Sequence, residues 1–198
     1  MANHVSFSIN FHKINDAAKA KLDQLYKQVD TNVQVDGEGT FNDLLQATEN
    51  QSNDWEWRIE NVGSKWCNLT DWDNDGIHGY SAWDAPVEGL QNLLNILSVE
   101  DPKMITTFTY EDEMPNFIGA YVYEGNEMLD GAQDDSDEIR GIVIYLSEDL
   151  THDDYDEDEC EWSSQEKEDI FYDELWEAVN QRQQELIDDG LCYVGGEN

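Results

Sequence analysis

The sequence predicts an α+β fold, in which one mostly antiparallel β-sheet carries helices packed on one face. Short segments of alternating apolar and polar residues are typical of half-buried strands, and they are interleaved with segments whose apolar residues recur at helical spacing. No internal repeat divides the 198 residues, and no linker rich in Pro, Gly or Ser does so either. The chain is therefore expected to form a single domain over residues 1–198.

The N-terminal segment, residues 1–50, is expected to hold one strand followed by helices. Residues 5–11 alternate between apolar and polar side chains, which predicts a strand with one buried face. Residues 15–29 carry apolar side chains at helical spacing, which predicts an amphipathic helix. A second, short helix is expected around residues 40–48.

Two strands and a helix are expected next along the chain. Residues 55–59 alternate between apolar and charged side chains, which predicts a strand, and residues 76–83 predict another. Asp84 is expected to cap the following helix, with Pro86 in its first turn. The buried stripe of this helix is expected to consist of Leu90, Leu93, Leu94 and Leu97.

The rest of the expected sheet lies between residues 104 and 146. Residues 104–110 and 117–123 predict a pair of strands joined by a turn. Residues 139–146 contain an unbroken apolar run, which predicts a central strand buried on both faces.

An acidic loop over residues 147–163 and a long helix over residues 164–189 complete the expected order. The apolar residues of this helix fall roughly on one side: Ile170, Leu175, Trp176, Val179, Leu186 and Ile187. Gly190 is expected to end the helix, and residues 191–194 predict an edge strand.

The composition is strongly acidic and narrows the choice of partners. Asp and Glu number 46 against ten Lys and Arg, so the formal charge is −36 and the isoelectric point is near 4.1. Such a charge excludes direct binding to nucleic acid or to an anionic membrane, and the expected partners are basic proteins or cations. Three cysteines without a C-x-x-C pair predict neither a disulfide framework nor a zinc site. Without a recognisable export signal or a long apolar run, a cytoplasmic protein is expected.

Acidic residues are densest between Asp134 and Glu177, where only Arg140 and Lys167 carry positive charge. Like charges at this density repel one another and oppose compaction. On the expected helix, acids recur at steps of three, four and four residues, which places neighbouring carboxylates about 5–6 Å apart. Phosphates along one DNA strand are spaced on a similar scale, so this row of carboxylates resembles a row of phosphates.

These acids and one tryptophan are the predicted partner-binding surface. Its residues are Asp153, Asp154, Asp156, Glu157, Asp158, Glu159, Glu161, Trp162, Glu166, Asp169, Asp173 and Glu177. Trp162 borders the acidic run and is the expected interface anchor. The alternative interpretation is a solvated surface whose charge only secures solubility.

A second motif, Asp71, Asp73 and Asp75 followed by Gly76, matches the first half of a calcium loop. Its second half departs from the pattern, because Ala82 occupies the twelfth position, where a bidentate Glu belongs. The motif leaves two interpretations open, a site for calcium or magnesium and a plain Asx-rich turn. No other cofactor is predicted.

Motifs that would indicate an enzyme are missing from the sequence. It contains no G-x-S-x-G, no Gly-rich phosphate loop and no H-E-x-x-H, and its four histidines have no metal-ligand spacing with the cysteines. No enzymatic activity is therefore predicted.

Three short blocks between residues 55 and 120 carry a family resemblance. They are Asn61-Val62-Gly63-Ser64-Lys65-Trp66, Ser81-Ala82-Trp83, and Tyr110-Glu111 followed by Phe117-Ile118-Gly119. These blocks resemble a family of uncharacterised phage and plasmid proteins with a ferredoxin-like domain, although Val62 stands where that family has Trp. The resemblance implies a ferredoxin-like core over residues 55–146 and a bacteriophage origin, and it implies no activity.

Charge and resemblance together lead to one hypothesis. The chain is expected to be a phage-encoded acidic protein that mimics DNA and blocks the nucleic-acid-binding surface of a basic host protein in the host cytoplasm, such as a defence, nucleoid or transcription factor. The alternative hypothesis is an acidic domain whose role lies in a divalent-cation loop at residues 71–76.

Overall fold

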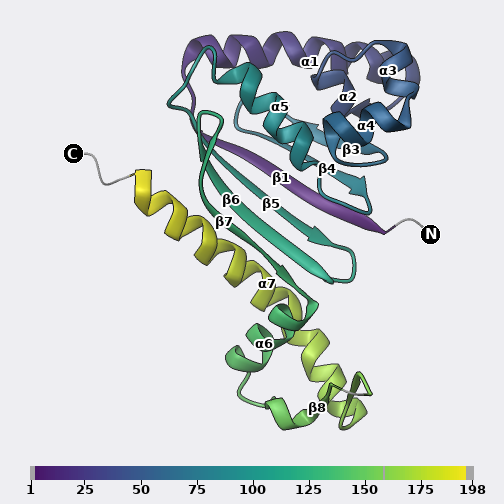
Figure 1. Cartoon of the computed structure of the whole chain (residues 1–198), viewed down its shortest axis with the longest axis vertical. Coiled ribbons are helices and arrows are strands. Elements are labelled where there is room, and N and C mark those ends of the chain that lie inside the picture. Colours follow the sequence, from purple (N-terminus) through teal and green to yellow (C-terminus); the bar gives the residue numbers. More distant parts are fainter. Residues whose placement is uncertain (1–2, 158, 195–198) are drawn as a thin grey trace.

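The computed structural model describes residues 3–157 and 159–194. Within them, seven strands form one antiparallel sheet in the order β2-β3-β4-β1-β5-β6-β7. The strands are β1 (His4–Lys13), β2 (Gly39–Thr40), β3 (Cys67–Trp72), β4 (Gly76–Ala82), β5 (Ile105–Asp112), β6 (Phe117–Glu124) and β7 (Glu127–Asp135). The helices are α1 (Asp16–Asp36), α2 (Phe41–Leu44), α3 (Glu49–Asn53), α4 (Trp55–Val62), α5 (Val87–Leu97), α6 (Ser136–Leu146) and α7 (Gln165–Val194). This is the predicted α+β architecture (Figure 1).

Most of the predicted elements are confirmed. The strands predicted at residues 5–11, 76–83, 104–110 and 117–123 correspond to β1, β4, β5 and β6. The helices predicted over residues 15–29 and 164–189 are parts of α1 and α7, which both extend further toward the C-terminus. The predicted stripe of α5 is fully buried: Leu90, Leu93, Leu94 and Leu97. Burial of each such side chain stabilises the fold by about 1.5–3 kcal/mol.

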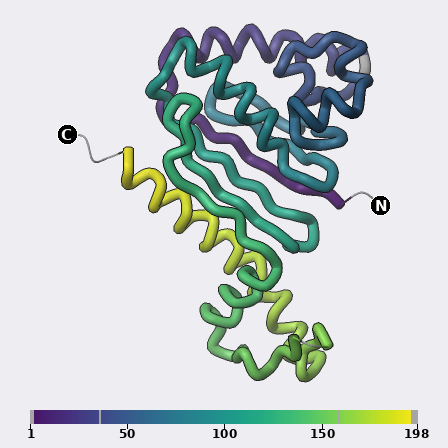
Figure 2. Tube along the Cα trace, viewed as in Figure 1, coloured from purple at the N-terminus to yellow at the C-terminus, as the bar shows by residue number. Residues whose placement is uncertain are grey.

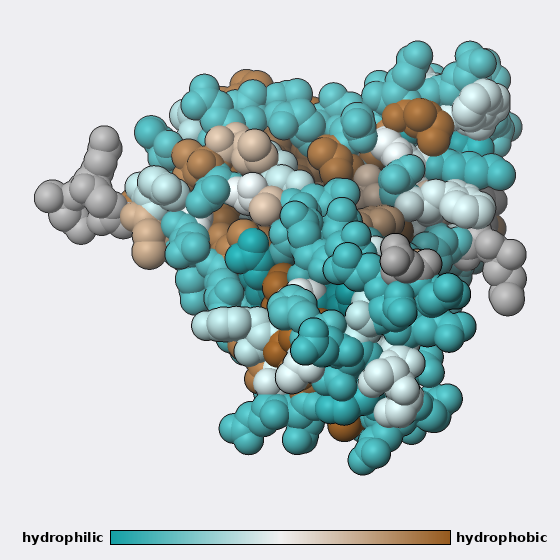
Figure 3. Space-filling view, turned by 60° about the horizontal axis from the view of Figure 1, so that its bottom comes forward, coloured by the Kyte–Doolittle hydropathy of each residue, from teal (hydrophilic) through white to brown (hydrophobic). Residues whose placement is uncertain are grey.

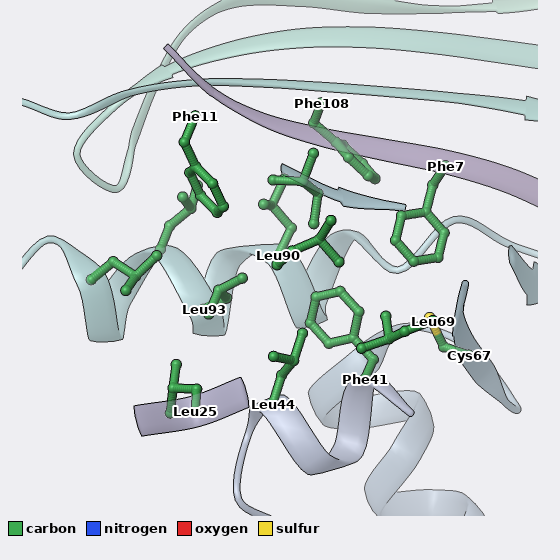
Figure 4. Packing of buried hydrophobic residues seen from close by; sticks show 14 of the residues in the cluster. Phe7, Phe11, Leu25, Phe41, Leu44, Cys67, Leu69, Leu90, Leu93 and Phe108 are labelled. Atoms are coloured by element: carbon green, nitrogen blue, oxygen red, sulfur yellow. The ribbon is translucent and has the colours of Figure 1, made fainter. Parts of the chain in front are cut away.

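The main hydrophobic core lies between the sheet and a layer that includes α1, α2 and α5. β1 lies between β4 and β5, and the side chains at alternate positions of β1 are buried in this core. Figure 4 shows Phe7, Phe11 and Phe108 of the sheet facing the helices that carry Phe41 and Leu90. The alternation at the start of the sequence therefore corresponds to a strand inside the sheet whose apolar face is buried in the main core.

On the opposite face of the sheet α7 packs against β6 and β7, so the prediction that helices pack on one face is wrong (Figure 1). β6 turns fully buried Ile118 and Val122 toward α7, while its alternate residues pack in the main core. Gly190 approaches β6 closely, since a Cβ on it would lie 2.4 Å from Val122 Cγ2. Gln183 is also buried there and donates a hydrogen bond of 2.9 Å to the carbonyl oxygen of Tyr110. Both sides of β6 are therefore covered.

The strand predicted at residues 55–59 is wrong, because these residues begin the helix α4. The Asp54 side chain accepts a hydrogen bond of 3.0 Å from the Glu56 N–H and caps the helix. Gly63, with φ of 87°, ends it in the left-handed conformation. Only Trp57 of the alternating residues packs against the main core, whereas Trp55 is 59% exposed. The alternation therefore did not mark a buried face.

The central strand predicted at residues 139–146 is also wrong, since residues 136–146 form the helix α6. The Asp135 carboxylate accepts hydrogen bonds from the N–H groups of Asp137 (2.9 Å) and Glu138 (3.1 Å), and the Glu138 side chain accepts one in return from the Asp135 N–H. This capping box starts the helix. The strand that pairs with β6 at this edge is β7, which the sequence pattern did not reveal.

Several predicted helix ends also differ from the structure. α5 begins after Pro86, and Asp84 does not cap it. Residues 40–48 hold the short α2, which is followed by Gln46 at φ of 55°, a conformation that no helix continues through. α7 runs through Gly190 to Val194, so the predicted stop at Gly190 and the predicted edge strand at residues 191–194 are wrong. Gly190 serves the close packing of α7 against β6.

Replacing Gly141 by Ala is expected to raise the free energy of unfolding by about 0.5–1 kcal/mol, because Ala is the better helix former. Gly141 lies inside α6, and no neighbouring element comes within 4 Å of the position of an added Cβ. Gly79→Ala is expected to lower the same free energy by about 1–3 kcal/mol, because its Cβ would lie 2.1 Å from the Asn68 carbonyl oxygen in the adjacent strand. Urea denaturation measures both changes, and a destabilising Gly141→Ala would contradict the helical structure of α6.

Candidate functional site

The acidic part of the chain forms a projection at one end of the molecule, away from the layer of α1 and α5 (Figures 1 and 2). α6, the N-terminal half of α7 and a small hairpin of β8 (Tyr155–Asp156) and β9 (Glu161–Trp162) build it, and a 3₁₀ turn, η1 (His152–Asp154), precedes the hairpin. A second hydrophobic cluster holds these elements together, and Ile118 of β6 belongs to it. The projection is thus anchored on the sheet by its own buried residues.

Lys167 attaches the acidic loop to α7. Its ammonium group donates a hydrogen bond to the Asp149 carbonyl oxygen and lies 3.3 Å from a carboxylate oxygen of Asp154. The same Asp154 oxygen accepts hydrogen bonds from the N–H (2.9 Å) and O–H (2.8 Å) of Thr151. These hydrogen bonds from Thr151, together with Lys167, lower the pKa of Asp154 below its usual range. Asp154, one of the predicted partner-binding residues, therefore has a structural role in the loop.

Trp162 lies half-buried within the projection. Its ring packs against the ring of Tyr155, 5.1 Å away between centroids, and against Phe171 of α7 at 4.9 Å. Tyr155 also packs against Arg140, whose guanidinium carbon lies 3.9 Å from the centre of the Tyr155 ring. Trp162 was expected to anchor a partner, and its contacts fasten the hairpin to α7.

The other predicted acids lie on the surface. Exposed carboxylates of the loop are those of Asp153, Asp156, Glu157, Glu159 and Glu161, and those of α7 are Glu166, Asp169, Asp173 and Glu177. Asp158 lies outside the described residues. Figure 3, in which this end of the molecule comes forward, shows a mostly hydrophilic face with small, separate hydrophobic patches. We call Glu166, Asp169, Asp173 and Glu177 the carboxylate row.

The carboxylate row faces solvent because the opposite side of α7 is buried. Ala178 and Val179 each lie one turn after Leu175, and all three pack in the second cluster. Arg182 adds an ion pair of 2.8 Å to Asp134, whose side chain is 8% exposed, and this hydrogen bond raises the pKa of Arg182. These contacts fix the rotation of α7 about its axis, so the row has a fixed direction on the surface.

Two aromatic side chains accompany the row on the exposed surface. Tyr172 is 48% exposed and Trp176 is 44% exposed. Trp176 was predicted on the buried side of the helix, and that prediction is wrong, because the buried positions follow Leu175 at steps of three and four residues. That spacing is the signal by which the sequence could have placed Trp176 outside the packing face.

A cleft of about 650 Å³ opens beside these aromatic residues. The β5–β6 turn, the start of α6, the hairpin and the N-terminal half of α7 line it. Its walls include the charged side chains of Asp137, Arg140 and Glu168 together with the ring of Tyr172. The cleft joins segments that are far apart in the sequence, and no sequence pattern indicated it.

The Asp71–Gly76 motif forms the turn of the β3–β4 hairpin. One Asp73 carboxylate oxygen accepts hydrogen bonds from the N–H groups of Asp75 (2.8 Å) and Gly76 (2.9 Å). The Asp73 carbonyl oxygen accepts a further one of 2.6 Å from the Tyr26 O–H. Residues 3–157 and 159–194 contain no group of three His, Cys, Asp or Glu arranged to hold a metal ion. The contacts of Asp73 are those of an Asx-rich turn.

Asp154→Asn is expected to loosen residues 151–163, because it removes the negative charge that Thr151 and Lys167 contact. Hydrogen exchange at pH 7 should show faster exchange in this segment. Asp153→Asn, which changes the exposed neighbouring carboxylate, is the matched control and should leave the exchange unchanged. Equal effects of both substitutions would contradict the structural role of Asp154.

Because the pKa of Asp154 is lowered in the folded protein, the contribution of this residue to stability depends on pH. Its stabilising contribution is present above about pH 3.9, the ordinary value for Asp, and is lost as the pH falls through its lower folded-state value. An NMR titration of the carboxyl carbon should therefore give a midpoint below about 3.9.

Comparison of the chain with protein-family models, with curated proteins and with solved structures found no match. In the part of the chain that the structure describes, no helix combines the length and the apolar character needed to cross a membrane. The chemistry of the candidate site therefore rests on its own residues: an outward row of carboxylates, a folded acidic loop, and a cleft lined by the hairpin, α6 and α7.

Proposed function

We propose that this chain is an interaction protein whose acidic projection mimics DNA and occupies the nucleic-acid-binding surface of a basic protein. The observation that carries this proposal is the carboxylate row, which is exposed along its whole length on a helix whose opposite side is buried. Neighbouring carboxylates at helical steps of three and four residues lie about 5–6 Å apart. A rigid row with this spacing can bind the Arg and Lys side chains with which a DNA-binding protein contacts phosphates.

The uneven distribution of charge supports this proposal over a role in solubility alone. Residues 134–198 contain 23 of the 46 acidic residues and only three of the ten basic ones, Arg140, Lys167 and Arg182. All three basic side chains contact groups within the projection or on β7. The carboxylate row is left to bind positive charge from outside the chain.

The ferredoxin-like fold is part of the same proposal. β1, α1, β3, β4, α5 and β5 follow the order strand-helix-strand-strand-helix-strand, and their strands lie in the sheet order β3-β4-β1-β5. This order supports a ferredoxin-like core, to which β6, β7, α6 and α7 are appended. The acidic projection would then be an addition to a common scaffold, in agreement with the resemblance to phage and plasmid proteins and with a phage origin.

The test is a pull-down from host lysate with the wild type and with the variant Glu166→Gln, Asp169→Asn, Asp173→Asn, Glu177→Gln. We expect the wild type to recover a basic DNA-binding protein and to prevent that protein from binding DNA. The variant should lose about 1–4 kcal/mol of binding free energy, since four exposed ion pairs contribute about 0.2–1 kcal/mol each. Capture should weaken at high salt because exposed charges are screened.

A matched control removes the same number of charges elsewhere. Asp23, Glu38, Glu60 and Glu100 are exposed and lie on or beside the helices that cover the other face of the sheet. Their change to Asn or Gln should leave the capture unchanged. Equal recovery by both variants and the wild type would show that the row binds no partner and would remove the proposal.

A further inference from the structure

The cleft beside the N-terminal half of α7 combines negative charge with aromatic surface. Its acidic lining residues are Asp137, Glu161 and Glu168, and its rings include Tyr155, Trp162 and Tyr172. Tyr172 is 48% exposed, and Met114 in the β5–β6 turn, which also lines the cleft, is 58% exposed. Carboxylates beside an accessible ring are the groups that bind a cation through charge and through the ring face together.

Arg140 demonstrates this chemistry inside the cleft. Its guanidinium lies 3.9 Å from the centre of the Tyr155 ring and donates a hydrogen bond of 2.9 Å to Asp137. Only 16% of the Arg140 side chain is exposed, so one guanidinium is already held between a ring and a carboxylate in this wall. The neighbouring pair of Glu168 and Tyr172, one turn apart on α7, offers a carboxylate and a ring of the same kind.

We propose that this cleft takes an arginine side chain of the basic partner, with the guanidinium stacked on Tyr172 and paired with Glu168. This inference rests on the proposed function and specifies how the partner is recognised. The row would bind several positive charges without distinguishing Lys from Arg, whereas the cleft distinguishes them. A guanidinium is planar, stacks on a ring and donates a fork of N–H groups, and a lysine ammonium group is a compact, strongly hydrated charge.

The location of the cleft allows the row and the cleft to act on one partner. Tyr172 and Glu168 lie in the same half of α7 as Asp169 and Asp173, next to them along the chain, although no residue of the row lines the cleft. Arginine is also the residue that most often pairs with planar acceptors in nucleic-acid recognition. A protein surface that binds DNA through arginine therefore carries the side chain that the cleft fits.

The experiment measures the affinity of the full chain for two labelled octapeptides at low salt, one alternating Arg with Gly and the other alternating Lys with Gly. We expect the arginine peptide to bind about three- to tenfold more tightly, the range of a cation–π contact at a partly exposed site. Tyr172→Ala should abolish this preference, and Tyr172→Phe, which keeps the ring, should retain it. Trp176→Ala is the matched control, because Trp176 is similarly exposed on α7 and does not line the cleft.

Circular dichroism of each variant establishes that it is folded before its affinity is compared. Equal binding of the two peptides, a preference that survives Tyr172→Ala, or equal losses in Tyr172→Ala and Trp176→Ala would each overturn the proposal for the cleft. The proposed function fails separately, when substitution of the carboxylate row leaves the capture of a basic protein unchanged. A row that is needed for capture together with equal peptide affinities would keep the proposed function and exclude the arginine site.

Discussion

The packing of α7 on the outer face of β6 determines which side chains of this helix face solvent. The Gly190–Val122 contact, the buried hydrogen bonds of Gln183 and the Arg182–Asp134 ion pair fix the helix on the sheet. Because Leu175, Ala178 and Val179 must then face inward, the acids of the carboxylate row face solvent. Repulsion among those acids is opposed by packing and not by neighbouring lysines, so hydrophobic burial maintains an otherwise unfavourable charge distribution.

The parts of the fold that the sequence predicted correctly are those in which burial on one face imposes a long, regular pattern. β1 and α5 are such elements, since every apolar position in their pattern is buried. The alternation at residues 55–59 covers only five residues, and residues 139–146 contain a continuous apolar run without alternation; both patterns are compatible with a helix as well as with a strand. The deciding signals were the caps Asp54 and Asp135 just before each segment, which act through hydrogen bonds to backbone N–H groups and not through hydrophobicity.

In the candidate site, the sequence identified the exposed acids but not the individual roles of the residues among them. In the sequence nothing distinguishes the roles of Asp154 and Trp162 from those of the other residues of the acidic run. Their structural roles follow from contacts in the folded loop: Asp154 pairs with Lys167, and Trp162 packs against the rings of Tyr155 and Phe171. The cleft was beyond sequence reasoning because its walls come from four segments that meet only in three dimensions. Local sequence patterns indicate which side of a helix is exposed, and they do not indicate which distant segments come together in the fold.

The division of α7 into two halves has a consequence for how this surface can evolve. The helix has 30 residues and is about 45 Å long; its C-terminal half packs on the sheet and its N-terminal half carries the row. Substitutions in the row change groups that no buried contact uses, so they are nearly neutral for folding. The acidic surface can therefore change in sequence while the sheet and the buried side of α7 stay constant.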